Sequence, residues 1–297
     1  MTQNLLVVGS GIMGRGIAFA AAIGGYNVTL QDILEEKLKE ARTEISWYFN
    51  KAVEKGKIEE FEEDAVKSRI SYSTNLEVEA KKADFVIEAV PEKLEIKKTV
   101  FEVLDQYCPP HTILATNTST MSPTEIGSYT RRSDKVIAMH FFNPVPKMKL
   151  VEIIRGLETS DETSELTRMI ALNMKKETVL VNEYPGFITS RISSLVGNEA
   201  FNMLMEGVGT PEEIDQAIEL GLNYPMGPFK LGDLVGLDTR LRNLEYLYNT
   251  LGERFRPSPL LVKYVKAGRL GRKTGKGVYD YSVKSEAQKD ESKTPVS

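Results

Sequence analysis

A glycine-rich turn near the start of the chain constrains the fold more than any other feature. Residues 9–14, GSGIMG, follow a short apolar run at residues 4–9 and open an amphipathic stretch at residues 12–24. This order predicts a strand, a tight turn and a helix, the context in which such a motif binds a dinucleotide. Glycine lets backbone N–H groups approach a pyrophosphate at the positive end of the helix dipole. The cofactor-binding candidates in this turn are Gly9, Gly11 and Gly14.

Asp32 follows the next predicted strand, residues 27–31, and narrows the choice of cofactor. A carboxylate at this position can accept hydrogen bonds from both adenosine ribose hydroxyls and repel a 2′-phosphate. The alternative role for Asp32 is that of a helix N-cap before the stretch that begins at Leu34, which is compatible with ribose binding. The sequence therefore favours NAD over NADP.

Short apolar runs alternate with helical patterns through the first part of the chain, residues 1–183. This predicts an α/β fold with a Rossmann-type, mostly parallel sheet. Beyond the first two strands, the runs at 85–90, 112–116, 136–139, 148–155 and 178–181 predict strands, and those at 95–107 and 162–175 predict helices. The charge-rich stretch 34–69, with a break around Gly56, is typical of a helical hairpin.

The second domain, residues 184–297, begins at a predicted linker, Tyr184-Pro185-Gly186, and is expected to be all-helical. Helical patterns cover residues 187–206, 211–220, 231–251 and 259–267, with Gly and Pro between them. The last fifteen or so residues are polar, and we expect a frayed tail there.

Charge and residue content exclude several classes of partner. The formal net charge of −4 over 297 residues gives no general attraction to nucleic acid. One cysteine and two histidines cannot build a common zinc cluster, so we expect no metal. The chain shows no export signal and no apolar run of membrane-spanning length. We therefore expect a cytoplasmic protein with no membrane partner.

His140 is predicted at the carboxyl end of an apolar strand, where ligands bind in open α/β sheets. The other histidine, His111, follows Pro110 at a typical surface turn. If residues 143–147 form a bend, Glu152 passes back beside His140 and can fix the tautomer of its imidazole. Such a pair suits alcohol oxidation, in which the hydroxyl proton needs an acceptor as hydride leaves carbon. A buried histidine with satisfied hydrogen bonds is the alternative.

Two further groups of polar residues could face a ligand. Asn117 and Ser119 follow another predicted strand at the same edge, although an ordinary polar turn is the alternative. Lys51, Lys55 and Lys57 cluster in the predicted helical hairpin and could meet ligand phosphates, although a solvated lysine face explains them equally well.

Together these motifs resemble the 3-hydroxyacyl-CoA dehydrogenase family, in its short bacterial 3-hydroxybutyryl-CoA dehydrogenase form. The resemblance covers nearly the whole chain, and its most specific segment is MHFFNPVPKMKLVEII, residues 139–154. Other matching segments are VVGSGIMGRGIA, IEAVPEKLEIKKTVF, ILATNTSTMS, PGFITSRIS, NYPMGPFKLGDLVGLD and LGRKTGKGVYDY. The resemblance implies reversible, NAD-dependent oxidation of a (3S)-3-hydroxyacyl-CoA to the 3-oxoacyl-CoA.

The resemblance also implies a role for each candidate residue. His140 would be the catalytic base, Glu152 its partner, and Ser119 the catalytic residue that holds the substrate's 3-oxygen. The further residues implied near the cofactor are Glu92, Lys97, Asn117 and Asn143, and those implied near the CoA phosphates are Lys51 and Lys55. The helical domain would close over the acyl-CoA substrate and form a homodimer.

One position departs from the family pattern. Where the family has an asparagine beside the active site, this chain has Ser190. A serine is shorter and offers a hydroxyl in place of an amide, so a contact to the thioester carbonyl or to Ser119 is lost or bridged by water. This change bears on rate and acyl preference more than on reaction type.

Two other functions stay open at this point. A dehydrogenase of the same fold could act on a hydroxy acid that is not a CoA ester, and removal of Lys51 and Lys55 would distinguish it. A non-catalytic NAD-binding protein is the second alternative, and a lack of NADH formation with any hydroxyacyl-CoA would favour it.

Overall fold

The structure is a computed structural model that describes residues 4–56 and 58–282. Lys57 and the polar tail expected at the end of the chain lie outside the described residues. The chain divides into two compact units, the first ending at Tyr184 and the second beginning at Pro185. No described helix has the length and apolar character needed to cross a membrane.

The first unit is built, within its described residues, on one eight-stranded sheet with the order β3-β2-β1-β4-β5-β6-β7-β8. Its strands are β1 (Asn4–Val8), β2 (Asn27–Gln31), β3 (Ile70–Ser73), β4 (Phe85–Glu88), β5 (Ile113–Thr116), β6 (Val136–Phe141), β7 (Leu150–Arg155) and β8 (Glu177–Asn182). These strands pair in parallel, except that β6 and β7 are antiparallel. The predicted Rossmann-type, mostly parallel sheet is confirmed.

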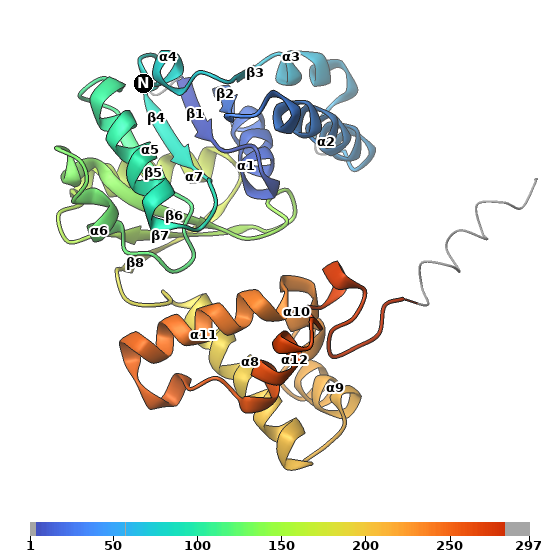
Figure 1. Cartoon of the computed structure of the whole chain (residues 1–297). Helices are drawn as coiled ribbons and strands as arrows, with labels where there is room; N and C mark the ends of the chain where they lie inside the picture. Colours follow the sequence, from blue (N-terminus) through green and yellow to red (C-terminus); the bar gives the residue numbers. More distant parts are fainter. Residues whose placement is uncertain (1–3, 57, 283–297) are drawn as a thin grey trace, which may run out of the picture. The chain divides into compact units, whose positions relative to one another are not determined.

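Helices cover both faces of this sheet (Figure 1). They are α1 (Ile12–Ile23), α2 (Glu35–Glu54), α3 (Glu63–Lys67), α4 (Leu76–Ala80), α5 (Leu94–Tyr107), α6 (Pro123–Gly127) and α7 (Asp161–Asn173). Successive residues of a strand point to opposite faces, so Leu5 and Val7 pack with α1, α2 and α7, whereas Leu6 and Val8 pack with α4, α5 and α6. Burial of the sheet on both faces explains the nearly continuous apolar strands seen in the sequence.

Two predictions for the first unit need correction. The stretch 34–69 is one long helix, α2, followed by a 3-10 turn (Glu60–Glu62) and the five-residue α3, rather than a balanced helical hairpin. The sequence between residues 59 and 64 is acidic, and Val66 is the residue of α3 that is buried. The edge strand β3 was not predicted, because its sequence, ISYS, contains two serines and lacks the apolar run that indicated β4 and β5.

The second unit is helical, as predicted. The α-helices of its described residues are α8 (Thr189–Glu206), α9 (Pro211–Gly221), α10 (Pro228–Val235), α11 (Leu237–Leu251) and α12 (Pro259–Lys266), with Phe201, Phe229 and Leu244 in the core. The continuous helix predicted over 231–251 is wrong, because the chain breaks at Gly236 with φ +104°. A side chain there would be strained and would place its Cβ 2.9 Å from Oδ1 of Asp238.

Candidate active site

The two candidate catalytic side chains lie opposite each other on β6 and β7. The antiparallel register pairs His140 with Glu152, and Nδ1 of His140 lies 2.8 Å from Oε2 of Glu152. Both side chains are buried, with exposed fractions of 7% for His140 and 0% for Glu152. The connection between the two strands makes the bend that the spacing predicted, and the bend brings an imidazole and a carboxylate together.

This pair has the arrangement of an acid–base group. A carboxylate on Nδ1 fixes the tautomer of the imidazole and stabilises the imidazolium that forms when Nε2 takes up a proton. Exclusion of water strengthens the electrostatic part of this interaction. The ring of Phe142 lies against His140, with 4.5 Å between ring centroids, and fixes the imidazole further.

The glycine turn leaves space where a phosphate would approach. Gly9 has φ +98°, and a Cβ on Gly14 would lie 1.8 Å from the carbonyl oxygen of Gly9, so the turn itself requires both glycines. A Cβ on Gly11, in contrast, would meet no heavy atom of the described chain within 4 Å. Gly11 is the N-cap of α1, and no side chain of the described residues caps that end. The open N-terminus of α1 therefore fits a dinucleotide pyrophosphate.

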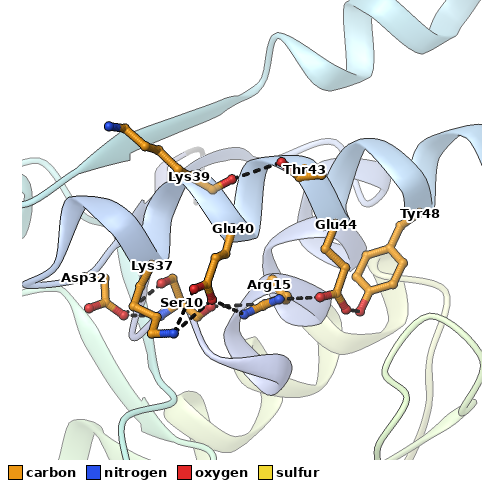
Figure 2. A network of polar contacts seen from close by, with 9 residues as sticks. All are labelled: Ser10, Arg15, Asp32, Lys37, Lys39, Glu40, Thr43, Glu44 and Tyr48. Atoms are coloured by element: carbon orange, nitrogen blue, oxygen red, sulfur yellow. Dashed lines mark hydrogen bonds and ion pairs between the residues drawn. The ribbon is translucent and has the colours of Figure 1, made fainter.

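Asp32 lies directly after β2 and is held in place by the glycine turn (Figure 2). Oδ2 of Asp32 accepts hydrogen bonds from the backbone N–H and the hydroxyl of Ser10, both at 2.8 Å. Oδ1 accepts the N–H of Leu34 at 3.2 Å. The N-cap of α2 is Leu34 itself, so the alternative N-cap role for Asp32 is wrong, although its carboxylate does support the entry into α2.

An ion-pair network behind the turn joins α1 to α2 (Figure 2). The side chain of Arg15 donates to the carbonyl of Ser10 at 3.2 Å and pairs with Glu44 and, at 3.8 Å, with Glu40. Tyr48 donates its hydroxyl to Glu44, and burial together with this hydrogen bond raises the pKa of Tyr48. The network holds the helix that follows Asp32 against the helix that carries the phosphate site.

Glu88 is a functional candidate that the sequence analysis missed. It is the last residue of β4 and is completely buried. Nζ of Lys97, also completely buried, lies 2.7 and 2.9 Å from the two oxygens of Glu88 and 3.2 Å from Oε2 of Glu92. The hydroxyl of Thr116 donates to Glu88 at 2.6 Å. The sequence feature that could have indicated Glu88 is an acid that ends an apolar run at the ligand-binding edge of the sheet.

The loop that carries Ser119 is tied to this buried cluster. Oε1 of Glu92 accepts the N–H of Ser119 at 3.0 Å. Asn117 donates its N–H to the carbonyl of Glu88 at 2.7 Å and accepts the N–H of Phe141 at 3.0 Å. The Asn117–Ser119 loop is thus connected both to the end of β4 and to the strand of His140.

Comparison with known proteins identifies the family of the chain. The family model described as 3-hydroxyacyl-CoA dehydrogenase, NAD binding domain, matches residues 4–184, and the model of the C-terminal domain of the same enzymes matches residues 186–281. The chain belongs to the 3-hydroxyacyl-CoA dehydrogenase family. It is an NAD-dependent dehydrogenase, and the resemblance seen in its motifs is confirmed.

Individual relatives match this dehydrogenase over nearly its whole length. A probable 3-hydroxybutyryl-CoA dehydrogenase of Bacillus subtilis is 48% identical over 95% of this chain and 99% of the relative. A 3-hydroxybutyryl-CoA dehydrogenase of Clostridioides difficile is 45% identical over 94% of this chain and 100% of the relative. The crystal structure of (S)-3-hydroxybutyryl-CoA dehydrogenase from Ralstonia eutropha superposes with a TM-score of 0.91 and 40% identity, covering 95% of this chain and 100% of that one.

The remaining candidate residues of the dehydrogenase lie on other elements, namely α2, the connection between β6 and β7, and α8 of the second unit. Lys51 and Lys55 are at the end of α2, where Nζ of Lys51 pairs with Glu54 at 2.6 Å and Lys55 is exposed. Asn143 is exposed in the connection between β6 and β7. Ser190 is half-buried on the first turn of α8 in the second unit. Within residues 4–56 and 58–282, no three His, Cys, Asp or Glu side chains are grouped as metal ligands.

Proposed function

We propose that this dehydrogenase oxidises the 3-hydroxyl of a (3S)-3-hydroxyacyl-CoA to the 3-oxoacyl-CoA with NAD, and catalyses the reverse reduction with the same groups. The observation that carries the proposal is the buried pair of His140 and Glu152, 2.8 Å apart at the carboxyl end of β6. The names of the relatives from Bacillus subtilis and Clostridioides difficile support an acyl-CoA substrate.

His140 is the proposed general base. When bound, NAD accepts the hydride that leaves C3 of the substrate. Nε2 of His140 takes the hydroxyl proton, because Nδ1 faces Glu152. Glu152 stabilises the positive charge that the imidazole then carries. The hydroxyl of Ser119 hydrogen-bonds the 3-oxygen and positions it for the transfer.

The proposed cofactor residues fall into two groups, the first predicted from the glycine-rich motif and the second from the family resemblance. Gly9, Gly11, Gly14 and Asp32 would hold the pyrophosphate and the adenosine ribose, and Glu92, Asn117 and Asn143 would lie near the nicotinamide end. Lys97 has no exposed surface and contacts Glu88 and Glu92. Its influence on the cofactor therefore passes through Glu92.

The remaining proposals concern the acyl-CoA and the assembly. Lys51 and Lys55 would meet the CoA phosphates as point charges. Ser190 would lie near the acyl thioester, in place of the family asparagine. We also propose a homodimer formed through the helical unit and a cytoplasmic location.

The direct test is NADH formation with (S)-3-hydroxybutyryl-CoA, with NAD and NADP compared. His140→Gln should lower kcat by about 10²–10⁴-fold, the usual contribution of general acid–base catalysis, while NAD binding persists. His111→Gln is the matched control, because His111 is the other of the two histidines and is exposed. Wild-type turnover in His140→Gln would contradict the assignment.

A second experiment separates a CoA ester from another hydroxy acid. The double variant Lys51→Ala with Lys55→Ala should raise KM for the full CoA substrate much more than for a truncated thioester without the CoA phosphates. Lys39→Ala, an exposed lysine on the same helix, should leave both values unchanged. Equal effects on the two substrates would favour a substrate that is not a CoA ester.

A further inference from the structure

Ser10 is a completely buried residue in the middle of the glycine turn, between Gly9 and Gly11. Its backbone N–H and its hydroxyl both donate to Oδ2 of Asp32, each at 2.8 Å (Figure 2). The backbone bond belongs to the turn and is open to every residue type except proline, which lacks the N–H. The hydroxyl bond depends on the side chain, so it is a contact that the serine adds to the turn.

These two bonds determine which oxygen of Asp32 is available to a ligand. A carboxylate has about four acceptor positions, two on each oxygen. Within the described residues, Oδ2 has two donors from Ser10, whereas Oδ1 has one, the N–H of Leu34 at 3.2 Å. Asp32 itself is only half-buried. Oδ1 is therefore the oxygen with capacity left for a ribose hydroxyl.

Ser10 is also held from its other side, so its hydroxyl has a fixed place. Its carbonyl accepts Nε–H of Arg15 at 3.2 Å, and Arg15 in turn pairs with acids of α2. The N–H of Gly9 donates to the carbonyl of Gln31, the last residue of β2, at 2.7 Å. The surroundings of Asp32 are thus connected before any dinucleotide binds, which reduces the ordering cost of binding.

We propose that Ser10 is a positioning residue whose hydroxyl sets the preference of this enzyme for NAD over NADP. The inference rests on the proposed function, because it takes Asp32 as the residue that meets the adenosine ribose. A carboxylate fixed in this place presents Oδ1 to a ribose hydroxyl and cannot turn away from a 2′-phosphate. Without the serine hydroxyl the carboxylate can turn, so it binds the ribose less well and repels the phosphate less strongly.

The dissociation constants of NADH and NADPH, measured by isothermal titration calorimetry, test this proposal without turnover. We expect the wild-type enzyme to bind NADH more tightly than NADPH. Ser10→Ala should lower the ratio of the NADPH constant to the NADH constant by about tenfold, the scale of one hydrogen bond to a charged group. Ser10→Cys, which has a weaker donor, should lower it less. In both variants kcat at saturating NAD should stay within about twofold of the wild type, because the bond affects binding of the adenosine end.

Two further variants serve as controls. Thr112→Val removes another completely buried hydroxyl, which donates to the carbonyl of Ala83 at 2.6 Å just before β5, at the opposite edge of the sheet. This variant should leave the ratio unchanged. In a protein that already carries Asp32→Ala, Ser10→Ala should have no further effect on the ratio, because the hydroxyl acts through the carboxylate.

The outcomes separate this inference from the proposed function. A ratio that stays at the wild-type value in both Ser10→Ala and Ser10→Cys overturns the inference, and so does an equal weakening of NADH and NADPH. An effect of the same size in the Asp32→Ala background would show that Ser10 acts independently of Asp32, and would also overturn it. Failure of the proposed function is a different result, in which the ratio changes as expected but no hydroxyacyl-CoA gives NADH formation.

Discussion

Glu88 and Glu152 are two completely buried carboxylates near the ligand-binding edge of the same sheet, and they pair with basic side chains of different kinds. Glu88 forms an ion pair with Lys97, which has no exposed surface. Glu152 pairs with His140, whose ring can be neutral or charged. One carboxylate therefore belongs to a buried lysine ion pair, and the other would, in the proposed mechanism, balance a charge that forms only when the imidazole takes up a proton.

The difference shows how similar buried acids can serve different purposes. A buried ion pair adds little net stability over an apolar pair, but loss of one partner leaves an uncompensated charge. Around Glu88, the pair extends through Glu92 to the backbone of Ser119, which suits a positioning role. Around Glu152, a partner whose ring can gain and lose a proton suits proton transfer.

The largest effect is expected from Glu152→Gln. An amide can still hydrogen-bond Nδ1 of His140 but cannot stabilise the imidazolium, so kcat should fall by about a hundredfold or more. The melting temperature should change less than in a variant of Glu88, because a neutral imidazole leaves no orphaned cation. Steady-state kinetics and thermal denaturation on the same preparation measure both. If this variant keeps the wild-type kcat, the proposed difference in function between Glu88 and Glu152 is wrong.

Glu88→Gln should reduce stability more, and turnover less, than Glu152→Gln does. Loss of this carboxylate leaves Lys97 with Glu92 as its remaining anion, and removal of one partner of a buried pair costs about 3–5 kcal/mol of folding free energy. We expect kcat to fall only about tenfold, through displacement of Glu92 from Ser119, a smaller loss than removal of a proton-transfer group causes. Chemical denaturation and initial rates test this.

A second variant controls for the orphaned charge. Addition of Lys97→Met to Glu88→Gln removes the buried ammonium and should recover most of the lost stability. Turnover should stay below that of the wild type, because Ser119 is still held less firmly. Full recovery of turnover together with stability would show that Glu88 only stabilises the fold.

The pairing of His140 with Glu152 could be predicted from the sequence because it depends on local geometry. His140 and Glu152 are twelve residues apart on neighbouring antiparallel strands, so one bend determines that they meet. The glycine turn was predictable for a similar reason, since Gly9 and Gly14 are required by contacts within the turn itself.

The pairing of Glu88 with Lys97 could not be predicted in this way. Its partner Lys97 is nine residues away, beyond a loop and in the first turn of a helix, and no periodic pattern specifies such a contact. The chain has 38 Lys and Arg and 42 Asp and Glu, so the residue types alone do not single out one buried pair. The break at Gly236 could not be predicted either, because a glycine within a helical pattern can also be tolerated.

Asp105, on α5, is another buried carboxylate of the first unit, and a variant of it is expected to have the smallest effect. Burial raises its pKa, but hydrogen bonds from Arg131 and Arg132, each at 2.9 Å, outweigh burial and hold the pKa of Asp105 below its usual range. A lowered pKa in the folded state means that the charged form stabilises the protein. An aspartate in the unfolded chain has a pKa of about 3.9, so this contribution is complete above about pH 5. It is lost as the pH falls through the lowered pKa of the folded state.

Asp105→Asn should therefore reduce the free energy of unfolding at pH 7 by about 1–3 kcal/mol, the range for hydrogen bonds to a charged group. The gap between variant and wild type should narrow as the pH is lowered below about 4. Turnover should stay at the wild-type value, because Asp105 contacts arginines and lies outside the proposed active site. Denaturation at pH 7, 5 and 3 measures the gap, and a gap of the same size at pH 3 would show that packing rather than charge accounts for it. A fall in turnover would instead mean that any buried carboxylate of this sheet domain affects the active site, whatever its partner. The proposed difference between Glu88 and Glu152 would then be wrong.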